Sequence, residues 1–383
     1  MRIQKLHFIS AVFPPWISGV GDHTAHLSAE LAKKIEVKVI TTRGEKADGL
    51  PDVKVEQIFS RERPSSILSV IEAIAADIPE WVILQYDPFA YGARYGFNPY
   101  LPLAVNLLKR RCPQVRISLI VHESFVPVHN WKSAVLSTWL NAQLWALSYV
   151  ADVIFMTIDP WISRLKSWFP NKIIQHLPVS SNIPCLPACR DEVRANLGIS
   201  PQTIVFGLFF GHVIRTRCLD HVIKACNLCR EAGFDVVVLY IGLSVAGVRN
   251  CLSHLPVVAD GSLTPDEISR RFAAMDVYMV PIDEGVSTRR TSLMTGLQHG
   301  VATVATFGQA TDPMLMEENG KAFLLADVNA PDDFANAVLD LVSNPLRRKM
   351  LSEGAKELFS REFTWEHISS KFLLTLESCT IRS

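Results

Sequence analysis

The residues with the clearest capacity for chemistry follow the apolar segment that ends at Pro281. They form a loop with a glycine, several hydroxyl groups and two adjacent arginines, and a helical pattern begins directly after it. Hydroxyl and guanidinium groups bind phosphate oxygens, and the amino end of a helix adds backbone N–H donors. We expect a diphosphate to be bound here by Ser287, Thr288, Arg289, Arg290, Thr291, Ser292 and Thr295. Ser292 is expected to cap the helix, and a capped helix with solvent-facing arginines is the structural alternative.

A second cationic segment follows the strand pattern of residues 206–210. It contains Gly211, His212 and Arg217 and leads into another helical pattern. The Arg217 guanidinium can hold two phosphate oxygens at once, while backbone N–H groups at the helix start share the charge. We therefore expect these three residues to bind the same diphosphate, although exposed arginines before helices are common in sites that bind nothing.

The amino-terminal half offers two further candidates, each at the end of an apolar run. A turn with Gly19 and Gly21 precedes a helical pattern, and glycines there let a ligand approach the backbone closely. His122 and Glu123 end the apolar run 117–121, where an imidazole and a carboxylate can bond sugar hydroxyls or move a proton. The alternatives are an ordinary strand-to-helix turn for the glycines and a structural role for His122.

Short β-branched runs alternate with amphipathic stretches along the chain, which is typical of βαβ units with parallel sheets. We expect strands at 6–10, 37–42, 81–86, 116–122, 153–157, 173–177, 204–210, 236–242, 277–281 and 302–306. We expect helices at 22–34, 99–111, 134–149, 219–232, 264–274, 293–299 and 332–341, and a mostly helical tail. The fold class is therefore α/β, with two doubly wound series that bind ligands at the carboxyl ends of their strands.

Prolines and serines between Pro178 and Pro187 interrupt both patterns, because proline suits neither a helix interior nor a central strand. We place the domain boundary there. The expected domains are 1–184 and 185–365, followed by a helix at 366–383 that packs back toward the first domain. Two such sheets favour a reaction of two substrates between the domains, from which closure would exclude water.

The bulk composition restricts the class of protein. Of 383 residues, 49% are apolar and 20% are charged, which is a globular balance. Lys plus Arg (38) equals Asp plus Glu (38), so we expect no nucleic acid as a partner. Without a long apolar run or a secretory signal pattern we expect a cytoplasmic protein, and peripheral contact with a membrane stays open. The eight cysteines lack framework spacing and are expected to be free thiols, with a metal or redox role for Cys226 and Cys229 as the alternative.

Taken together, these segments resemble the GT-B retaining glycosyltransferases of family GT4, the glycosyltransferase group 1. The resemblance lies in the segments 13–15, 19–22, 84–88, 121–123, 177–184, 211–219, 261–267, 274–281 and 300–306. It implies two facing Rossmann-like domains with a C-terminal helix that crosses back. The first domain would bind the acceptor and the second a nucleotide-sugar donor, such as a UDP- or GDP-sugar, with no other cofactor.

The same resemblance gives roles to single residues. Arg217 stands where the family keeps a lysine of its donor-phosphate pair, and His212 stands where it keeps the paired arginine. His122 stands at the family histidine near the transferred sugar. The family's two signature glutamates correspond to Ser287 and Thr295, and neither is acidic. Glu284 lies three residues before the first of these positions, from where a loop could bring it close.

We therefore expect the transfer of a sugar to a glycan, a lipid or a small-molecule acceptor, with retention of configuration and without a metal ion. Arg217, Arg289 and Arg290 would stabilise the leaving diphosphate, in place of a metal, and the sequence contains no Asp-x-Asp element. The catalytic candidates on the sugar side are His122, Glu123 and Glu284. Two alternatives stay open: a catalytically silent protein that binds a nucleotide or glycan, and a nucleotide-sugar epimerase.

Overall fold

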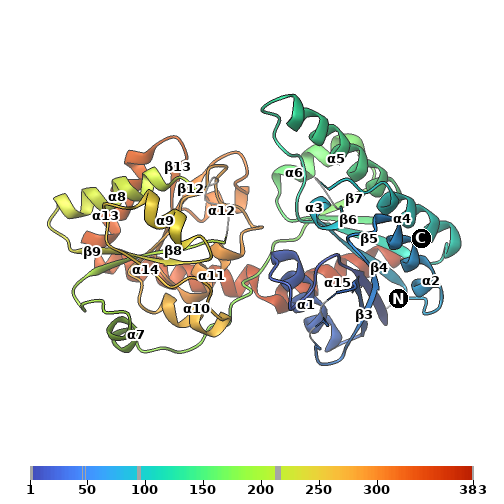
Figure 1. Cartoon of the computed structure of the whole chain (residues 1–383), viewed down its shortest axis with the longest axis horizontal. Helices are drawn as coiled ribbons and strands as arrows, with labels where there is room; N and C mark the ends of the chain where they lie inside the picture. The colour runs from blue at the N-terminus through green and yellow to red at the C-terminus, as the bar shows by residue number, and fades with distance from the viewer. Residues whose placement is uncertain (1–2, 45, 48, 93–95, 212–216, 382–383) are drawn as a thin grey trace. The chain divides into compact units, whose positions relative to one another are not determined.

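The computed structural model describes residues 3–44, 46–47, 49–92, 96–211 and 217–381 (Figure 1). The chain folds into two compact units. Unit 1 is Met1–Pro178 together with Trp365–Ser383, and unit 2 is Val179–Thr364. Each unit has its own parallel sheet covered by helices, so the expected α/β class with two doubly wound domains is confirmed.

Unit 1 is built on a seven-stranded parallel sheet in the order β3-β2-β1-β4-β5-β6-β7. Its strands are β1 (Lys5–Ile9), β2 (Glu36–Thr42), β3 (Val53–Phe59), β4 (Trp81–Tyr86), β5 (Arg116–Val121), β6 (Val153–Met156) and β7 (Ile173–His176). The chain runs outward from β1 to β3 and then returns to β4 beside β1. The carboxyl ends of β1 and β4 therefore mark the topological switch point, where such sheets bind ligands.

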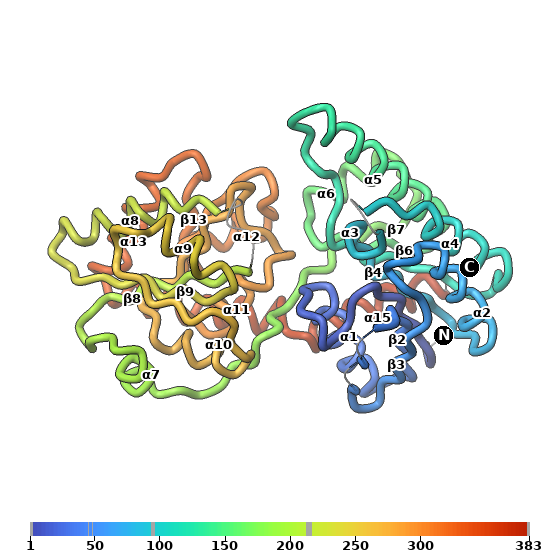
Figure 2. Tube along the Cα trace, viewed as in Figure 1, coloured from blue at the N-terminus to red at the C-terminus, as the bar shows by residue number. Residues whose placement is uncertain are grey.

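Helices cover both faces of this sheet, and each face has its own apolar core. The helices are α1 (Gly19–Ala32), η1 (Pro64–Leu68), α2 (Ser69–Ala75), α3 (Pro88–Tyr91), α4 (Tyr100–Arg111), α5 (Trp131–Val150), α6 (Pro160–Trp168) and α15 (Trp365–Ile381). Helices α2, α4, α5 and α6 contribute to one core. Helices α1 and α15 contribute to the other, where Phe372 and Leu376 of α15 are fully buried. The expected C-terminal helix is thus present and is part of unit 1, as the red end of the tube in Figure 2 shows.

Unit 2 repeats the plan with a six-stranded parallel sheet in the order β10-β9-β8-β11-β12-β13. Its strands are β8 (Ile204–Phe209), β9 (Val236–Ile241), β10 (Val257–Ala259), β11 (Val277–Val280), β12 (Thr303–Phe307) and β13 (Leu324–Asp327). Its helices are α7 (Arg190–Asn196), α8 (Leu219–Glu231), α9 (Val245–Cys251), α10 (Pro265–Phe272), α11 (Thr291–His299), α12 (Pro313–Glu317), α13 (Pro331–Ser343), α14 (Pro345–Leu358) and η2 (Phe359–Phe363). Here the strand order reverses between β8 and β11, which makes their carboxyl ends the second switch point.

The division between the units lies after Pro178, earlier in the chain than the expected boundary after Pro184. The residues that follow Pro178 are bound into unit 2. The backbone N–H of Val179 donates to the carbonyl oxygen of Thr288 at 2.9 Å, and its side chain is buried in a core of unit 2. Proline and serine interrupt the helix and strand patterns here, but they do not prevent the segment from packing.

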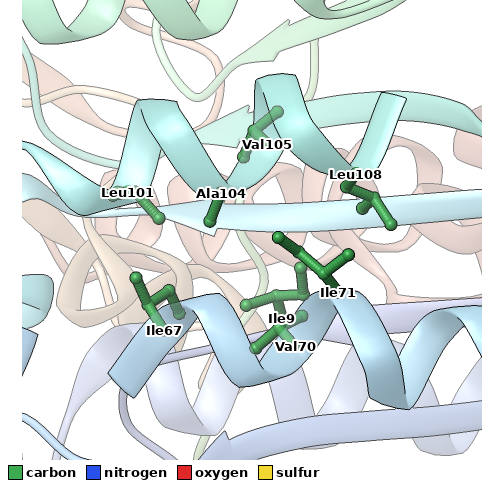
Figure 3. Close-up of a pocket in the computed structure, with 8 residues that line it drawn as sticks. All are labelled: Ile9, Ile67, Val70, Ile71, Leu101, Ala104, Val105 and Leu108. Atoms are coloured by element: carbon green, nitrogen blue, oxygen red, sulfur yellow. The ribbon is translucent and has the colours of Figure 1, made fainter. Parts of the chain in front are cut away.

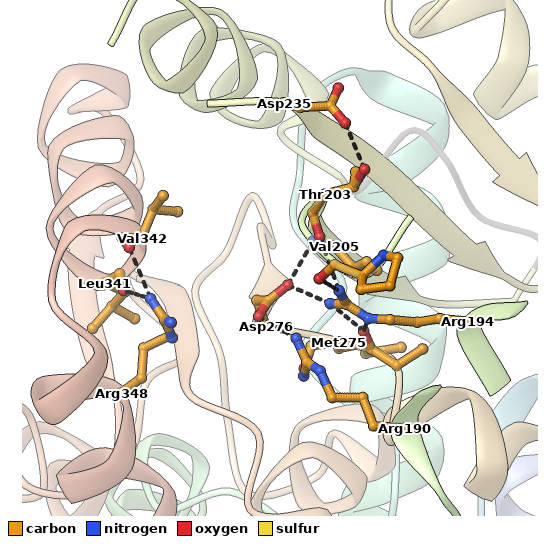
Figure 4. A network of polar contacts seen from close by, with 12 residues as sticks. Arg190, Arg194, Thr203, Val205, Asp235, Met275, Asp276, Leu341, Val342 and Arg348 are labelled. Carbon is orange, nitrogen blue, oxygen red and sulfur yellow. Dashed lines mark hydrogen bonds and ion pairs between the residues drawn. The ribbon is translucent and has the colours of Figure 1, made fainter. Parts of the chain in front are cut away.

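A buried ion pair fastens α7 to the amino-terminal edge of the second sheet (Figure 4). Nη2 of Arg194 lies 2.6 Å from Oδ2 of Asp276, and the guanidinium also donates to the carbonyl oxygen of Ala274. The same Oδ2 accepts from the backbone N–H of Val205 at 2.8 Å. Since only 1% of the Arg194 side chain is exposed, its charge needs these partners, and the network is structural.

A small apolar cavity lies in unit 1 between α2, α4 and β1 (Figure 3). Its volume is about 10 Å³, and aliphatic side chains line it throughout: Ile9, Ile67, Val70, Ile71, Leu101, Ala104, Val105 and Leu108. A space of this size without polar groups is a packing defect rather than a binding site. In the part of the chain that the structure describes, no helix combines the length and the apolar character needed to cross a bilayer.

Candidate functional site

Arg217 lies where the carboxyl ends of β8 and β11 meet in unit 2. Its backbone pairs with that of Ile282, just beyond β11, and its guanidinium lies 5.1 Å from the centre of the Phe210 ring. Burial, together with the positive charge of Arg290, lowers the pKa of Arg217 to about 10. The side chain is still a cation at neutral pH, and its charge repels that of Arg290.

Glu284 forms ion pairs with both arginines that were predicted to bind the diphosphate. Its Oε1 lies 2.5 Å from Nη2 of Arg289 and also contacts Nη2 of Arg290. Burial raises the pKa of Glu284, but the charges of the two arginines outweigh this effect and leave the pKa below its usual value. The arginines therefore do not simply face solvent. A diphosphate bound here would compete with the Glu284 carboxylate for the same guanidinium groups.

Two contacts that the sequence did not reveal hold this loop in place. The buried Asp312 carboxylate accepts the backbone N–H of Thr288 at 2.7 Å, which fixes the hydroxyl-rich part of the loop. Gly285 has φ +87°, and a Cβ atom there would lie 2.2 Å from the backbone nitrogen of Gly308. Only glycine fits this turn, because the conformation and the close approach both exclude a side chain.

The start of α11 differs from the sequence-based prediction. Arg290 is the N-cap residue, and no side chain caps the helix. Ser292 is the second helical residue, so its predicted capping role was wrong. It lies beyond the cap because the helix begins at Thr291, two residues before the expected start. The backbone N–H groups of the first turn still point out of the helix, as a phosphate site requires.

The two positions that correspond to the signature glutamates are fully buried. Thr295 donates its hydroxyl to the carbonyl oxygen of Thr291 at 2.9 Å, and the same hydroxyl lies 3.1 Å from Oγ of Ser181. Ser287 has no hydrogen-bond partner for its Oγ within the described residues. The Thr295 hydroxyl is thus engaged inside unit 2, whereas Ser287 has a buried hydroxyl in the loop that carries the arginines.

The remaining candidates of unit 2 differ in how accessible they are. Thr288 is buried, whereas Thr291 and Ser292 are partly exposed at the start of α11. Gly211 is exposed just beyond β8. His212 was predicted to assist the phosphate contact and lies outside the described residues.

In unit 1, His122 lies at the carboxyl end of β5, as predicted. Its Nε2 lies 2.6 Å from the side-chain oxygen of Gln85, a fully buried residue of β4 that the sequence did not single out. Burial lowers the pKa of His122 to about 3. The imidazole is therefore neutral near pH 7 and can exchange hydrogen bonds, but it is a poor proton donor.

A chain of aromatic ring contacts leads from this histidine to helix α15. The ring of His23, from α1, lies 4.7 Å from that of His122 and 5.3 Å from that of Trp365. The ring of His26 stacks on Trp365. Burial, followed by the neighbouring histidines, lowers the pKa of His23 well below its usual value. Helix α15 thus supplies Trp365 to a group of rings at the switch point of the first sheet.

Glu123 follows His122, and its charge acts on Asp87, which lies just beyond β4. Burial raises the pKa of Asp87 to about 6, although its contact with the backbone of Phe89 opposes the shift, and the charge of Glu123 adds to the rise. Two carboxyl groups therefore lie at neighbouring strand ends, and that of Asp87 has a raised pKa. Asp87 was missed because it also acts as the N-cap of α3.

Gly19 and Gly21 lie inside the first turn of α1, because the helix begins at Gly19 and not at the expected Asp22. Ser18 caps the helix and accepts from the backbone N–H of Gly21 at 3.5 Å. A Cβ atom at Gly21 would lie 3.3 Å from the backbone of Phe13, whereas a Cβ atom at Gly19 would have no neighbour within 4 Å among the described residues. Gly21 permits close packing, and Gly19 leaves open space at the amino end of the helix.

The comparisons with known proteins agree with this arrangement. Residues 205–344 match the family model of glycosyl transferases group 1. Sucrose-phosphate synthase from Thermosynechococcus elongatus has a similar structure, with a TM-score of 0.73 and 14% identity over 99% of this chain and 100% of that one. HepE of Anabaena in complex with UDP-glucose gives a TM-score of 0.71 and 14% identity over 98% of this chain and 99% of that one.

A relative in sequence is the D-inositol 3-phosphate glycosyltransferase of Rhodococcus opacus (strain B4). It is 25% identical over 232 residues, which are 55% of this chain and 49% of the relative. Matches to curated relatives span about half of their length, from 44% to 52%. The fold is that of the GT-B glycosyltransferases. The match of residues 205–344 in unit 2 to the model of the group 1 glycosyl transferases agrees with the resemblance seen in the sequence.

Proposed function

We propose that this protein transfers a sugar from a nucleotide-sugar donor, bound by unit 2, to a hydroxyl group of an acceptor. The observation that carries the proposal is the grouping of Arg217, Arg289 and Arg290 at the carboxyl ends of β8 and β11. Three guanidinium groups at a switch point suit a diphosphate, and the start of α11 adds backbone donors. The UDP-glucose complex of HepE and the family of unit 2 support a nucleotide sugar as the ligand.

In this proposal the arginines stabilise the charge that grows on the diphosphate as the sugar departs, and no metal ion is needed. Glu284 balances part of the charge of Arg289 and Arg290 until the diphosphate replaces it. Because like charges that lie close together are costly, exchange of one carboxylate for a diphosphate lowers the repulsion between Arg217 and Arg290.

On the side of unit 1, the neutral His122 would orient a sugar or acceptor hydroxyl, held in place by Gln85. Asp87 has the proton affinity of a group that exchanges protons near neutral pH. Retention of configuration follows in this proposal from the resemblance to GT4. The acceptor would be a glycan, a lipid-linked molecule or a small molecule.

The test begins with a panel of UDP-, GDP- and ADP-sugars in thermal unfolding. A donor at a hundred times its dissociation constant should stabilise the protein by about 2.7 kcal/mol. The stabilising donor is then incubated without acceptor, and slow release of free sugar is followed with and without a chelator. We expect hydrolysis that survives the chelator and falls by about one to two powers of ten in Arg217→Ala.

Arg271→Ala is the matched control, since Arg271 of the same unit pairs with Asp260 away from the loop. Its hydrolysis rate should equal that of the parent. Absence of stabilisation by every donor, or an absolute need for a divalent metal, would refute the proposal.

The second candidate function is a silent protein that binds a nucleotide sugar without turning it over. The burial of Ser287 and Thr295, uncharged where the family resemblance places glutamates, favours it. Stabilisation by a donor without any hydrolysis or transfer would identify this function. Appearance of an epimeric nucleotide sugar would instead identify the epimerase considered from the sequence.

A further inference from the structure

The outer side of α5 carries a continuous row of uncharged, exposed side chains. The row consists of residues three or four positions apart, which fall on one side of a helix: Trp131, Val135, Thr138, Ala142, Trp145 and Tyr149. Trp131, Val135 and Tyr149 are 73%, 63% and 64% exposed. Tryptophan with so much of its ring in water is uncommon, because a large apolar surface is left unburied.

Helix α4 continues the exposed apolar surface. Tyr100, Leu103 and Leu107 lie on its outer side, and Phe97 just before the helix packs on Trp139 of α5 with ring centres 4.4 Å apart. The opposite sides of both helices are buried in the same core of unit 1, so the two exposed sides face away from the sheet together. Half of the large apolar side chains exposed in the described part of the chain lie between Phe97 and Tyr149.

We call this surface the aromatic face and define it by Phe97, Tyr100, Leu103, Leu107, Trp131, Val135, Trp145 and Tyr149. A shallow groove along α5, lined by Ala134, Val135, Thr138, Trp139 and Ala142, adjoins it.

Positive charges predominate around the aromatic face, where Asp152, paired with Lys109, follows α5. Neither α4 nor α5 contains an aspartate or glutamate. The exposed Arg110 and Arg111 end α4, and the exposed Lys132 begins α5. The neighbouring α6 is also free of acidic residues and adds exposed Arg164 and Lys166. The chain as a whole has equal numbers of acidic and basic residues, so this local excess of positive charge is a property of the surface.

We propose that the aromatic face binds the surface of an anionic lipid bilayer. Tryptophan and tyrosine favour the boundary between lipid and water, where the ring is apolar and its polar atom stays hydrated. Leucine and valine enter the acyl region, and arginine and lysine at the border bind lipid phosphates. A protein partner would also accept aromatic residues, but it would need acidic groups opposite a border that is mostly basic.

Vesicle co-sedimentation of the full chain, without any donor, tests the proposal and is independent of sugar transfer. The protein should bind vesicles of phosphatidylcholine with phosphatidylglycerol and bind phosphatidylcholine alone much more weakly. Arg110→Gln and Arg111→Gln should each lower partition into the anionic vesicles about fivefold. Binding should also shift tryptophan emission to shorter wavelength, and brominated lipids should quench it.

The variant Trp131→Ser with Trp145→Ser should lose the binding. Its melting temperature should fall only slightly, since Trp131 is exposed and the half-exposed Trp145 loses ring contacts with Tyr149 and Phe169. The matched control is Leu346→Ser with Met350→Ser, which removes two exposed apolar side chains from α14 of unit 2 and should bind like the parent. Equal binding of the parent and the double tryptophan variant would overturn the proposal. The proposal would also be overturned if the parent bound no vesicles but formed a dimer that the double tryptophan variant does not form.

Discussion

The replacement of Arg217 by alanine tests whether this arginine is functional or structural, because the structure predicts a large effect on turnover and a small effect on stability. Burial and the charge of Arg290 depress the pKa of Arg217, so the folded state holds this cation at a cost. Loss of the charge removes that cost, while loss of the contact with the Phe210 ring removes about 1 kcal/mol of favourable interaction. The free energy of unfolding should therefore change little.

Turnover should respond much more strongly. A charge-assisted contact that strengthens as the diphosphate leaves contributes about 1.5 to 3 kcal/mol, so turnover should fall by about one to two powers of ten. The Michaelis constant should change less, since the contact is strongest in the transition state. Arg217→Lys should be milder, because the cation is kept.

The assay measures the transfer or hydrolysis rate at saturating donor, beside a thermal melt of each variant. Arg271→Ala is again the control. The reasoning is refuted if Arg217→Ala turns over like the parent. It is equally refuted if the melting temperature drops steeply while the residual folded protein remains fully active.

Three further predictions rest on single groups. Glu284→Gln should bind the nucleoside diphosphate about tenfold more tightly in calorimetry, because the competing carboxylate is gone, and should lower the melting temperature. Gly285→Ala should destabilise the protein in denaturant unfolding by about 2 kcal/mol or more, through strain and the clash with Gly308. Gly320→Ala, also at positive φ but in open space, should cost only about 1 kcal/mol. The free energy of unfolding should fall as the pH drops from about 6.5 toward 3, because the pKa of His122 is about 3 in the folded protein and 6.5 in the unfolded chain. This pH dependence, measured by denaturant unfolding, should be weaker in His122→Gln.

The sequence predicted the central strands, because each of them is an apolar run followed by a loop. It also predicted that polar residues gather at the carboxyl ends of these strands. It missed β3, β10 and β13, which lie toward the sheet edges. The run 53–59 alternates charged with apolar residues, and β10 has only three residues. Such strands form because a neighbour offers hydrogen bonds, which no local pattern reveals.

The candidate site was predictable to a similar degree. His122 and the arginine loop stand next to strong strand patterns. Gln85 and Asp312 act through contacts with residues 37 and 24 positions away, and so remain invisible until the fold brings them together. The pairing of Glu284 with the arginines was also unexpected, since a carboxylate five positions before a guanidinium faces it only if the loop turns as Gly285 allows.

Two proposals concern unit 1, an acceptor site near His122 and a lipid-binding aromatic face, and both involve the edge of the sheet where the strands end. A helix that follows a parallel strand begins at that strand's carboxyl end, so the first residues of α5 lie at the same edge as His122 and Glu123. The aromatic face therefore starts, at Trp131, on the side of the sheet that holds the candidate acceptor site. With that face on a bilayer, an acceptor anchored in the lipid would reach the site without leaving the membrane.

We expect vesicles to stimulate transfer to a lipid-linked acceptor in the parent and not in Trp131→Ser with Trp145→Ser. Donor hydrolysis in solution should be equal in both proteins, because the proposed donor site lies in unit 2. Equal stimulation of both proteins would show that the face does not present the acceptor, even if it binds lipid.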